Sequence, residues 1–263
     1  MKKILTIIIP VYEYVKKLEF LIESIDPGFC NVILIDDGST INRESVINLC
    51  KKYSKQSHIK VVLEDHAGTW ETRKKALQYV ETPYFTFANS DDLAFSKHLE
   101  HLCHKMQENE LKFGVGRVRL SYDDFWCGVS RRRHEGIMDF EKNPRNLGDL
   151  LNTVWGKVYH QSLIPEFFFE QNVVIYEDTI APYLLAMHAK KGYFTNKQIY
   201  FYQMRHDSTL FQMTDSTATV GLRNLYLCSM YRRKAFDKEG KLEDYISELD
   251  AIDIRLFLQR IQR

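Results

Sequence analysis

The fold class follows from one stretch, Ile33-Leu34-Ile35-Asp36-Asp37-Gly38-Ser39-Thr40. Its apolar half is typical of a buried β-strand. The chain then changes abruptly to two acids, a glycine and two hydroxyl residues. Open α/β sheets bind their ligands at the carboxyl ends of the strands, so we expect the two acids at a ligand site. Carboxylates at that place suit the hydroxyl and amide N–H groups of a nucleotide better than its phosphates.

Strands and helices alternate around this stretch. The expected strands are 5–10, 31–36, 59–63 and 84–88, and the expected helices are 15–25, 45–53, 69–80 and 96–106. Short links between them predict a parallel sheet with right-handed crossovers. Beyond about residue 105 the alternation is less regular. There we expect strands at 113–121, 153–159 and 193–202, and helices at 146–152, 177–188, 214–234 and 242–261.

The composition is that of a soluble globular protein. The chain has 263 residues, of which 44% are hydrophobic and 27% charged, and its net charge of +1 gives no general affinity for nucleic acid. None of the five cysteines forms a C-x-x-C pair, which predicts free thiols in a reducing cytoplasm and argues against a zinc site. The apolar run 4–11 is too short for a signal peptide and contains Pro10. No stretch reaches the roughly 18–20 apolar residues that span a bilayer.

Polar groups follow all four strands of the first half. They are Pro10-Val11-Tyr12-Glu13, Asp36-Asp37, His66-Ala67-Gly68 and Asn89-Ser90-Asp91-Asp92. Because parallel strands end at one edge of a sheet, these groups can meet in one crevice. Asp91 and Asp92 repel each other unless a cation lies between them, and their oxygen atoms suit Mg²⁺ or Mn²⁺, which bridge phosphates. The alternative is that one of the two acids is the N-cap of the helix expected at 96–106.

These groups resemble the sequence blocks of family 2 glycosyltransferases with the GT-A fold. The matching residues are Thr6-Ile7-Ile8-Ile9-Pro10-Val11-Tyr12, Leu34-Ile35-Asp36-Asp37-Gly38-Ser39-Thr40, Gly68 with Arg73, Asn89-Ser90-Asp91-Asp92, Val154-Trp155-Gly156-Lys157-Val158-Tyr159 and Tyr176-Glu177-Asp178-Thr179. Six blocks in the family's order make the resemblance specific over roughly residues 4–210.

The resemblance implies an α/β fold of the GT-A type. This is a three-layer α/β/α sandwich with a mostly parallel central sheet, followed here by C-terminal helices. The glycosyltransferase domain would span 1–212, with a nucleotide-binding half (1–105) and an acceptor-binding and catalytic half (106–212). Residues 213–263 would form a helical extension. The last helical pattern runs to the end of the sequence without a stop signal, which favours a fragment of a longer protein.

The resemblance also implies a nucleotide-diphosphate-sugar donor, most often a uridine one. The residues expected to bind the donor are Pro10, Val11, Tyr12, Asp37, Arg73, Asn89, Ser90 and Arg205, and those expected to bind the metal are Asp91 and His206. Asn89 stands where the family usually has the first acid of its D-x-D motif, and an amide carries no charge, so metal affinity is expected to be lower. His66 and Ile41 also replace the usual Asn and Asp.

Family members of the inverting kind use a carboxylate in the block at 176–178 as the base. Asp178 is our first choice and Glu177 our second, and the alternative is that both acids merely favour a helix N-terminus. Lys157 is expected beside Glu177 or a phosphate. Trp155 suits either a sugar face or the core. The cluster Arg131-Arg132-Arg133-His134 is either a solvated surface or a contact for phosphate or an acidic acceptor.

The predicted reaction is metal-assisted, inverting transfer of a sugar to a glycan or lipid-linked acceptor hydroxyl, as in bacterial surface-polysaccharide synthesis. A cytoplasmic location is expected, with or without peripheral contact at the inner face of the plasma membrane. The C-terminal helices suit such a contact or ordinary packing. Their relevant residues are Arg255, Phe257, Leu258, Arg260, Ile261 and Arg263.

Two other functions stay open. A nucleotidyltransferase would normally carry a Gly-rich, basic loop after the first strand, and residues 10–14 contain neither glycine nor positive charge. A catalytically impaired domain that only binds nucleotide or glycan is the second alternative, because of Asn89.

Overall fold

The computed structural model describes residues 2–13, 15–122, 125–129, 134–169, 177–204 and 215–261. Its strands are β1 (Leu5–Val11), β2 (Cys30–Asp37), β3 (Ile59–Glu64), β4 (Tyr84–Phe87), β5 (Leu93–Ala94), β6 (Phe113–Tyr122), β7 (Phe125–Val129), β8 (Gly136–Asp139), β9 (Lys157–His160) and β10 (Lys191–Met204). Its α-helices are α1 (Leu18–Glu23), α2 (Arg43–Tyr53), α3 (Thr69–Leu77), α4 (Ser96–Glu108), α5 (Ala181–Ala189), α6 (Asp215–Lys238) and α7 (Leu242–Ile261). Three 3₁₀ helices are η1 (Pro144–Asp149), η2 (Gln161–Phe167) and η3 (Glu177–Thr179).

One sheet runs through the molecule in the order β3-β2-β1-β4-β9-β6-β10-β5, with β7 paired to β6 and β8 to β10. Strands β3, β2, β1 and β4 are parallel, as the alternation predicts. Strand β9 is antiparallel to both of its neighbours, whereas β10 is parallel to β6. The sheet is therefore parallel in its first half and mixed in its second.

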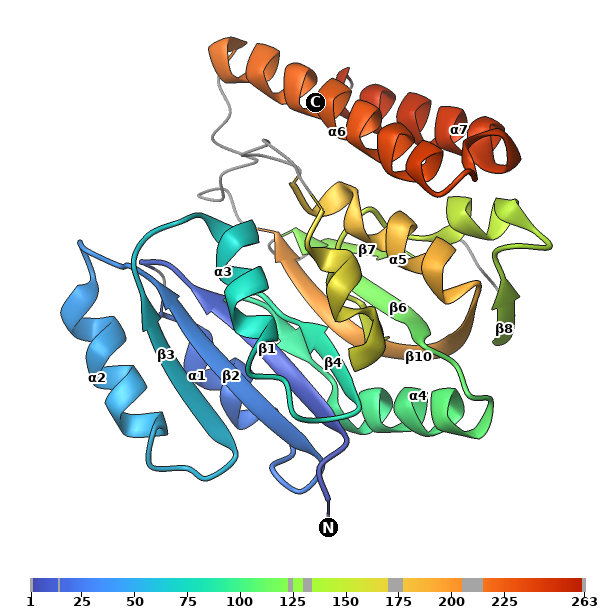
Figure 1. The fold of residues 1–263 in the computed structure, drawn as a ribbon. Coiled ribbons are helices and arrows are strands. Elements are labelled where there is room, and N and C mark those ends of the chain that lie inside the picture. Colours follow the sequence, from blue (N-terminus) through green and yellow to red (C-terminus); the bar gives the residue numbers. More distant parts are fainter. Residues whose placement is uncertain are drawn as a thin grey trace.

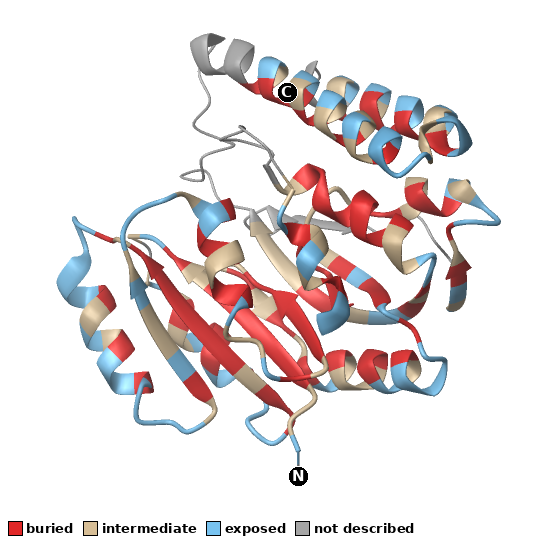
Figure 2. Cartoon of the chain, in the orientation of Figure 1, coloured by how far each residue is buried: buried red, intermediate tan, exposed pale blue. Residues whose placement is uncertain are grey.

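Helices cover both faces of this sheet (Figure 1). Successive side chains of a strand point to opposite faces, so Ile8 packs with α3 and α5 while Ile7 and Ile9 pack with α1, α2 and α4. Figure 2 shows the buried residues concentrated in the strands and on the helix sides that face them. These layers confirm the predicted three-layer α/β/α sandwich.

The C-terminal helices α6 and α7 lie side by side and pack on α5 and η1 (Figure 1). Leu225 and Phe236 of α6, with Leu249 and Ile252 of α7, belong to the same apolar cluster as one face of the sheet. None of the helices within the described ranges is long and apolar enough to cross a membrane.

The second half differs locally from the expected pattern. The helix expected at 146–152 is the 3₁₀ helix η1, and the strand expected at 153–159 begins only at Lys157. Gly156 has φ +72°, a conformation that interrupts an extended strand. The helix expected at 177–188 divides into η3 and α5, since Pro182 fits only the first turn of a helix. Strands β5, β7 and β8 have no counterpart in the expected pattern.

Candidate active site

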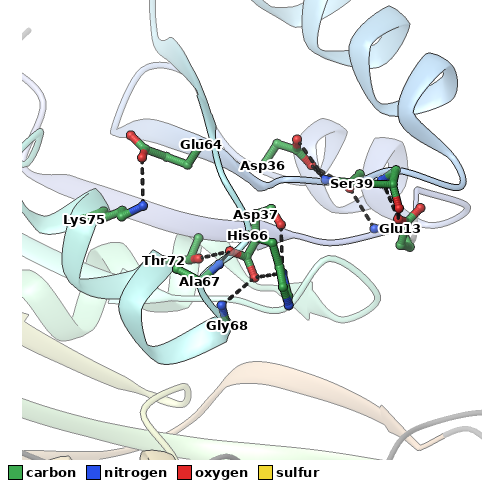
Figure 3. A network of polar contacts seen from close by, with 11 residues as sticks. Glu13, Asp36, Asp37, Ser39, Glu64, His66, Ala67, Gly68, Thr72 and Lys75 are labelled. Carbon is green, nitrogen blue, oxygen red and sulfur yellow. Dashed lines mark hydrogen bonds and ion pairs between the residues drawn. The ribbon is translucent and has the colours of Figure 1, made fainter.

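Asp37, at the carboxyl end of β2, is buried and fully engaged in hydrogen bonds (Figure 3). Its carboxylate accepts from the backbone N–H groups of Ala67 (2.8 Å) and Gly68 (3.1 Å) and from Thr72 Oγ1 (2.6 Å). The Nδ1 atom of His66 lies 3.1 Å from Oδ2 of Asp37. Asp37 therefore fixes the loop between β3 and α3 and the start of α3.

An aromatic pair lies next to this carboxylate. The rings of Tyr12 and His66 stack with their centroids 4.6 Å apart and their planes at 25°. Tyr12 is 47% exposed, while the preceding Val11 is buried and Pro10 is partly buried within β1. The end of β1 thus offers an exposed, flat ring surface of the kind on which a nucleotide base can stack.

Gly38 allows the β2 and β3 loops to approach each other. It has φ +68°, and a Cβ atom there would lie 2.4 Å from the backbone nitrogen of His66. Any other residue would push the loop that holds Asp37 and His66 out of place. The glycine of the first quoted stretch is therefore required by both conformation and space.

Glu13 ties the end of β1 to the start of α2, a role that our sequence reasoning missed. Its carboxylate accepts from the backbone N–H groups of Thr40 (2.5 Å), Ile41 (2.9 Å) and Asn42 (2.6 Å). The Thr40 bond is the largest cause that lowers the pKa of Glu13 to about 2. The sequence carried one signal for this role. Position 41 lacks the acid that the family often has there, and Glu13 supplies a carboxylate at that turn instead.

Asn89 stands between Arg73 and Asp92 at the end of β4. Its Oδ1 accepts from Arg73 Nη2 at 3.2 Å, and its Nδ2 donates to Asp92 Oδ2 at 3.0 Å. Asp92 is fully buried and also accepts from Tyr200 Oη (2.6 Å) and the backbone N–H of Gln203 (2.8 Å). Asp92 thus joins the segment after β4 to β10.

The two acids of this segment do not cap α4, whose N-cap residue is Phe95. Asp91 and Ser90 are partly exposed beside the buried Asp92. Burial, together with the negative charge of Asp91, raises the pKa of Asp92 to about 8. The N-cap alternative for Asp91 and Asp92 is therefore wrong, and of the two acids only Asp91 is partly exposed to solvent.

The donor set fits a metal ion that binds through few protein ligands. Within the described ranges, no three or more His, Cys, Asp or Glu side chains gather closely enough to hold an ion by themselves. Mg²⁺ and Mn²⁺ commonly complete their shells with substrate phosphates and water around one or two carboxylates. Asp91 could be such a carboxylate. Arg205 and His206, the other predicted ligands of donor and metal, lie outside the described residues, as do residues 131–133 of the basic cluster.

Asp178 lies in η3, partly buried, and accepts a hydrogen bond from the backbone N–H of Val154. Burial raises the pKa of Asp178, and the positive charges of Arg73 and then Lys157 partly offset that increase. The same Arg73 contacts Asn89, and its neighbour Thr72 contacts Asp37. The structure therefore brings α3, the end of β4 and η3 together around Arg73. The side chain of Glu177 lies outside the described residues.

Lys157 is a buried lysine close to Asp178, with 1% of its surface exposed. Its Nζ donates to the backbone carbonyls of Thr153 (2.5 Å) and Trp155 (3.4 Å). Burial lowers the pKa of Lys157 to about 7, against a smaller opposing effect of Asp178. Trp155 is also buried and stacks on Tyr200 and Tyr202 at 5.0 Å each, so the core-packing alternative for this residue is correct.

The fold is that of the GT-A class of proteins, and comparisons with known proteins agree. The model of glycosyl transferase family 2 matches residues 6–169. Glycosyltransferase GlyA of Streptococcus pneumoniae is 25% identical over 220 residues, which are 78% of this chain and 31% of GlyA. The chain thus spans about a third of that relative's length.

Two solved structures share the fold. S. aureus TarS 1–349, in complex with UDP-GlcNAc, superposes with a TM-score of 0.67 at 15% identity, over 92% of this chain and 71% of TarS 1–349. The mannosyltransferase PcManGT of Pyrobaculum calidifontis, in complex with GDP-Man and Mn²⁺, gives 0.64 at 12% identity, over 98% and 73% of the two chains. The chain belongs to glycosyl transferase family 2, as the resemblance of its blocks implied, and it has the GT-A fold.

Proposed function

We propose that this domain transfers a sugar from a nucleotide-diphosphate-sugar to an acceptor hydroxyl by a single, inverting displacement. One observation carries the proposal: the Asp178 carboxylate lies near Arg73 and Lys157, and Arg73 also contacts Asn89 of the acidic segment. This reaction needs three parts: a base, a cation for the leaving group and a segment that binds the metal.

The donor would lie across the ends of β1, β2 and β4. Tyr12 offers a ring surface for the base, while Pro10 and Val11 hold that ring in place as part of β1. Asp37 shapes the base site through the loop it binds, and Arg73 supplies positive charge for the diphosphate. Asn89 and Ser90 are the candidates for the ribose. A uridine donor is our first choice, supported by the UDP-GlcNAc complex of TarS. Because PcManGT was solved with GDP-Man, a guanosine donor is tested as well.

Mg²⁺ or Mn²⁺ would be held at Asp91, with His206 as a second ligand. When bound, such an ion neutralises charge that develops on the departing diphosphate. Arg73 adds positive charge on the other side, and Arg205 is expected to close over the same group. The ring of Tyr12 keeps the base, and hence the sugar, in a fixed orientation.

Asp178 removes the proton from the acceptor hydroxyl. Burial raises its pKa, which makes it a stronger base than an exposed aspartate, and the positive charges of Arg73 and Lys157 partly offset that increase. Glu177 is the second candidate for this role. The proton transfer is concerted with attack of the acceptor oxygen on the anomeric carbon and departure of the nucleoside diphosphate.

The acceptor would be a glycan or a lipid-linked sugar of a surface polysaccharide, which suggests a peripheral contact with the inner face of the plasma membrane. In the C-terminal helices, Arg255 donates to the carbonyl of Gly148 (2.7 Å) and Phe257 packs against the core. Ile254 and Leu258 are exposed and form the apolar surface available for this contact. Arg263 and the side chains of Arg260 and Ile261 lie outside the described residues.

The test measures release of nucleoside diphosphate from UDP-GlcNAc, UDP-glucose, UDP-galactose and GDP-mannose, with and without Mn²⁺. We expect Mn²⁺-dependent turnover of one donor, and a loss of about 10²–10⁴-fold in Asp178→Asn. Glu108→Gln is the matched control, since Glu108 pairs with Lys105 on the exposed side of α4. Absence of turnover with every donor would favour a binding domain, and undiminished turnover in Asp178→Asn would exclude Asp178 as the base.

A further inference from the structure

A buried arginine of the C-terminal helices reaches the catalytic segment. Arg232 of α6 is 1% exposed, although its side chain is always charged. Its Nη1 donates to the backbone carbonyl of Thr179 (3.1 Å) and to Thr179 Oγ1 (3.3 Å), while Nη2 forms an ion pair with Asp253 of α7. The guanidinium also lies over the ring of Tyr183, 5.7 Å from its centroid.

The contact is next to the proposed base. Thr179 follows Asp178 directly and ends η3, and Thr179, Ile180 and Ala181 are all buried. Asp178 is thus held from two sides, by the backbone N–H of Val154 at its carboxylate and by Arg232 at the following residue. A change in either contact would move the carboxylate relative to the donor.

The acid that pairs with Arg232 is itself fixed. Asp253 is buried and also accepts from Ser229 Oγ (2.6 Å) and Arg233 Nη2 (2.7 Å), and Arg233 further pairs with Asp250 (2.7 Å). Packing α6 onto α5 does not require a charge, because apolar residues of similar volume usually stabilise a core as well or better. A planar guanidinium is needed where one group must bind an acid and a backbone carbonyl in fixed directions.

We propose that α6 and α7 are a positioning element of the active site, with Arg232 setting the place of Asp178 through Thr179. The inference rests on the proposed function, in which Asp178 is the base. Arg232 touches no reacting atom and is therefore a positioning residue. The C-terminal helices, on this view, are required for the rate of sugar transfer as well as for packing.

The test compares Arg232→Lys with Arg233→Lys. Both variants make the same chemical change on the same helix and beside the same acid, but only Arg232 contacts Thr179. Lysine is a point charge that cannot bind Asp253 and Thr179 together in the guanidinium geometry. We expect Arg232→Lys to lower kcat for Mn²⁺-dependent donor turnover by about 10-fold to 100-fold with an unchanged donor KM, because a catalytic group displaced by about 1 Å costs rate. Arg233→Lys should retain the kcat of the wild type.

A second readout does not need turnover. Hydrogen exchange of the amides at 178–183 should become faster in Arg232→Lys and stay unchanged in Arg233→Lys. Thr179→Val removes the hydroxyl that accepts from Arg232 and keeps the backbone carbonyl, so it should lower kcat less than Arg232→Lys does. If Arg232→Lys fails to fold, Thr179→Val takes its place in the comparison. Equal kcat and equal exchange in a folded Arg232→Lys would overturn the inference. Absence of turnover in the wild type would instead refute the proposed function, and the exchange data would still decide whether Arg232 holds the segment.

Discussion

Arg73 Nη2 donates a hydrogen bond to Asn89 Oδ1 over 3.2 Å, and this contact joins α3 to the segment that follows β4. The amide of Asn89 simultaneously donates to Asp92, which a carboxylate at position 89 could not do. The replacement of the family's usual acid by Asn89 is therefore matched to a buried acid three residues later. Asn89 is explained by its surroundings without assuming that catalysis is lost.

Asn89→Asp should destabilise the metal-free protein above about pH 8, where Asp92 is ionised. The new carboxylate would face Asp92, now 3.0 Å from the amide nitrogen, and would replace a hydrogen bond by repulsion between like charges. We expect a loss of about 1–3 kcal/mol in the free energy of unfolding, together with a larger stabilisation by Mn²⁺ than in the wild type. Thermal unfolding with and without Mn²⁺ measures both effects. Asn109→Asp, on the exposed end of α4, is the control.

Lys157→Met should change how stability depends on pH. The pKa of Lys157 is lowered from 10.5 to about 7, so between those values the unfolded chain binds more protons than the folded protein. The contribution of Lys157 is therefore fully present above the unfolded pKa of 10.5 and is lost as pH falls through about 7. The slope contributed within this window approaches about 1.4 kcal/mol per pH unit.

Urea unfolding from about pH 7 to about pH 10 should show this rising contribution in the wild type and its loss in Lys157→Met. Lys105→Met removes an exposed lysine that pairs with Glu108 and should leave the contribution intact. Because the pKa of Asp178 is raised, its contribution to stability falls as pH rises, opposite to that of Lys157. The comparison is therefore repeated in an Asp178→Asn background. Parallel pH profiles for wild type and Lys157→Met would show that burial does not lower the pKa of Lys157.

Gly38→Ala and Gly240→Ala separate backbone strain from close packing. Both glycines have positive φ, +68° and +64°, but a Cβ at Gly240 meets no atom within 4 Å, whereas one at Gly38 would lie 2.4 Å from His66 N. Gly240→Ala should cost roughly 1–2 kcal/mol from strain alone. Gly38→Ala should cost about 1–3 kcal/mol more and weaken donor binding, because the loop that holds Asp37 must move. Equal losses in chemical denaturation would mean that the β2 and β3 loops adjust freely.

Glu13→Gln should weaken donor binding more than it affects the global fold. The carboxylate binds three backbone N–H groups at the start of α2 and directly follows Tyr12, the proposed base platform. A neutral amide holds these groups less firmly, so we expect the UDP dissociation constant to rise by about threefold to tenfold. Calorimetric titration with UDP and Mn²⁺ measures it. Glu19→Gln, at a surface pair with Lys52, should bind UDP like the wild type.

Because the pKa of Glu13 is lowered from 4.5 to about 2, the contact is favourable above the unfolded pKa and is lost as pH falls through about 2. UDP binding should therefore not weaken through this contact between about pH 7 and about pH 5. A weakening of wild-type binding in that range that is absent in Glu13→Gln would contradict this assignment of Glu13.

The sequence predicted the fold well where short stretches of the chain carry a clear pattern of apolar and polar residues. The buried strand that ends in Asp36-Asp37 and its three parallel neighbours follow from apolar runs and short links. The short strands β5 and β8 did not, since two to four residues carry no clear periodicity. The sequence named candidate site residues, but it did not predict the groups that these residues contact. Arg232 and Thr179 are 53 residues apart, and only the packing of α6 on α5 brings them together.

The most direct test of the shared pocket is diffraction from crystals grown with UDP and Mn²⁺, recorded at a wavelength where manganese scatters anomalously. We predict one manganese peak at Asp91 that contacts the diphosphate, the uracil ring against Tyr12, and the Asp178 carboxylate facing the open side of the β-phosphate. A manganese peak away from Asp91, or UDP bound away from Tyr12 and Arg73, would contradict the account.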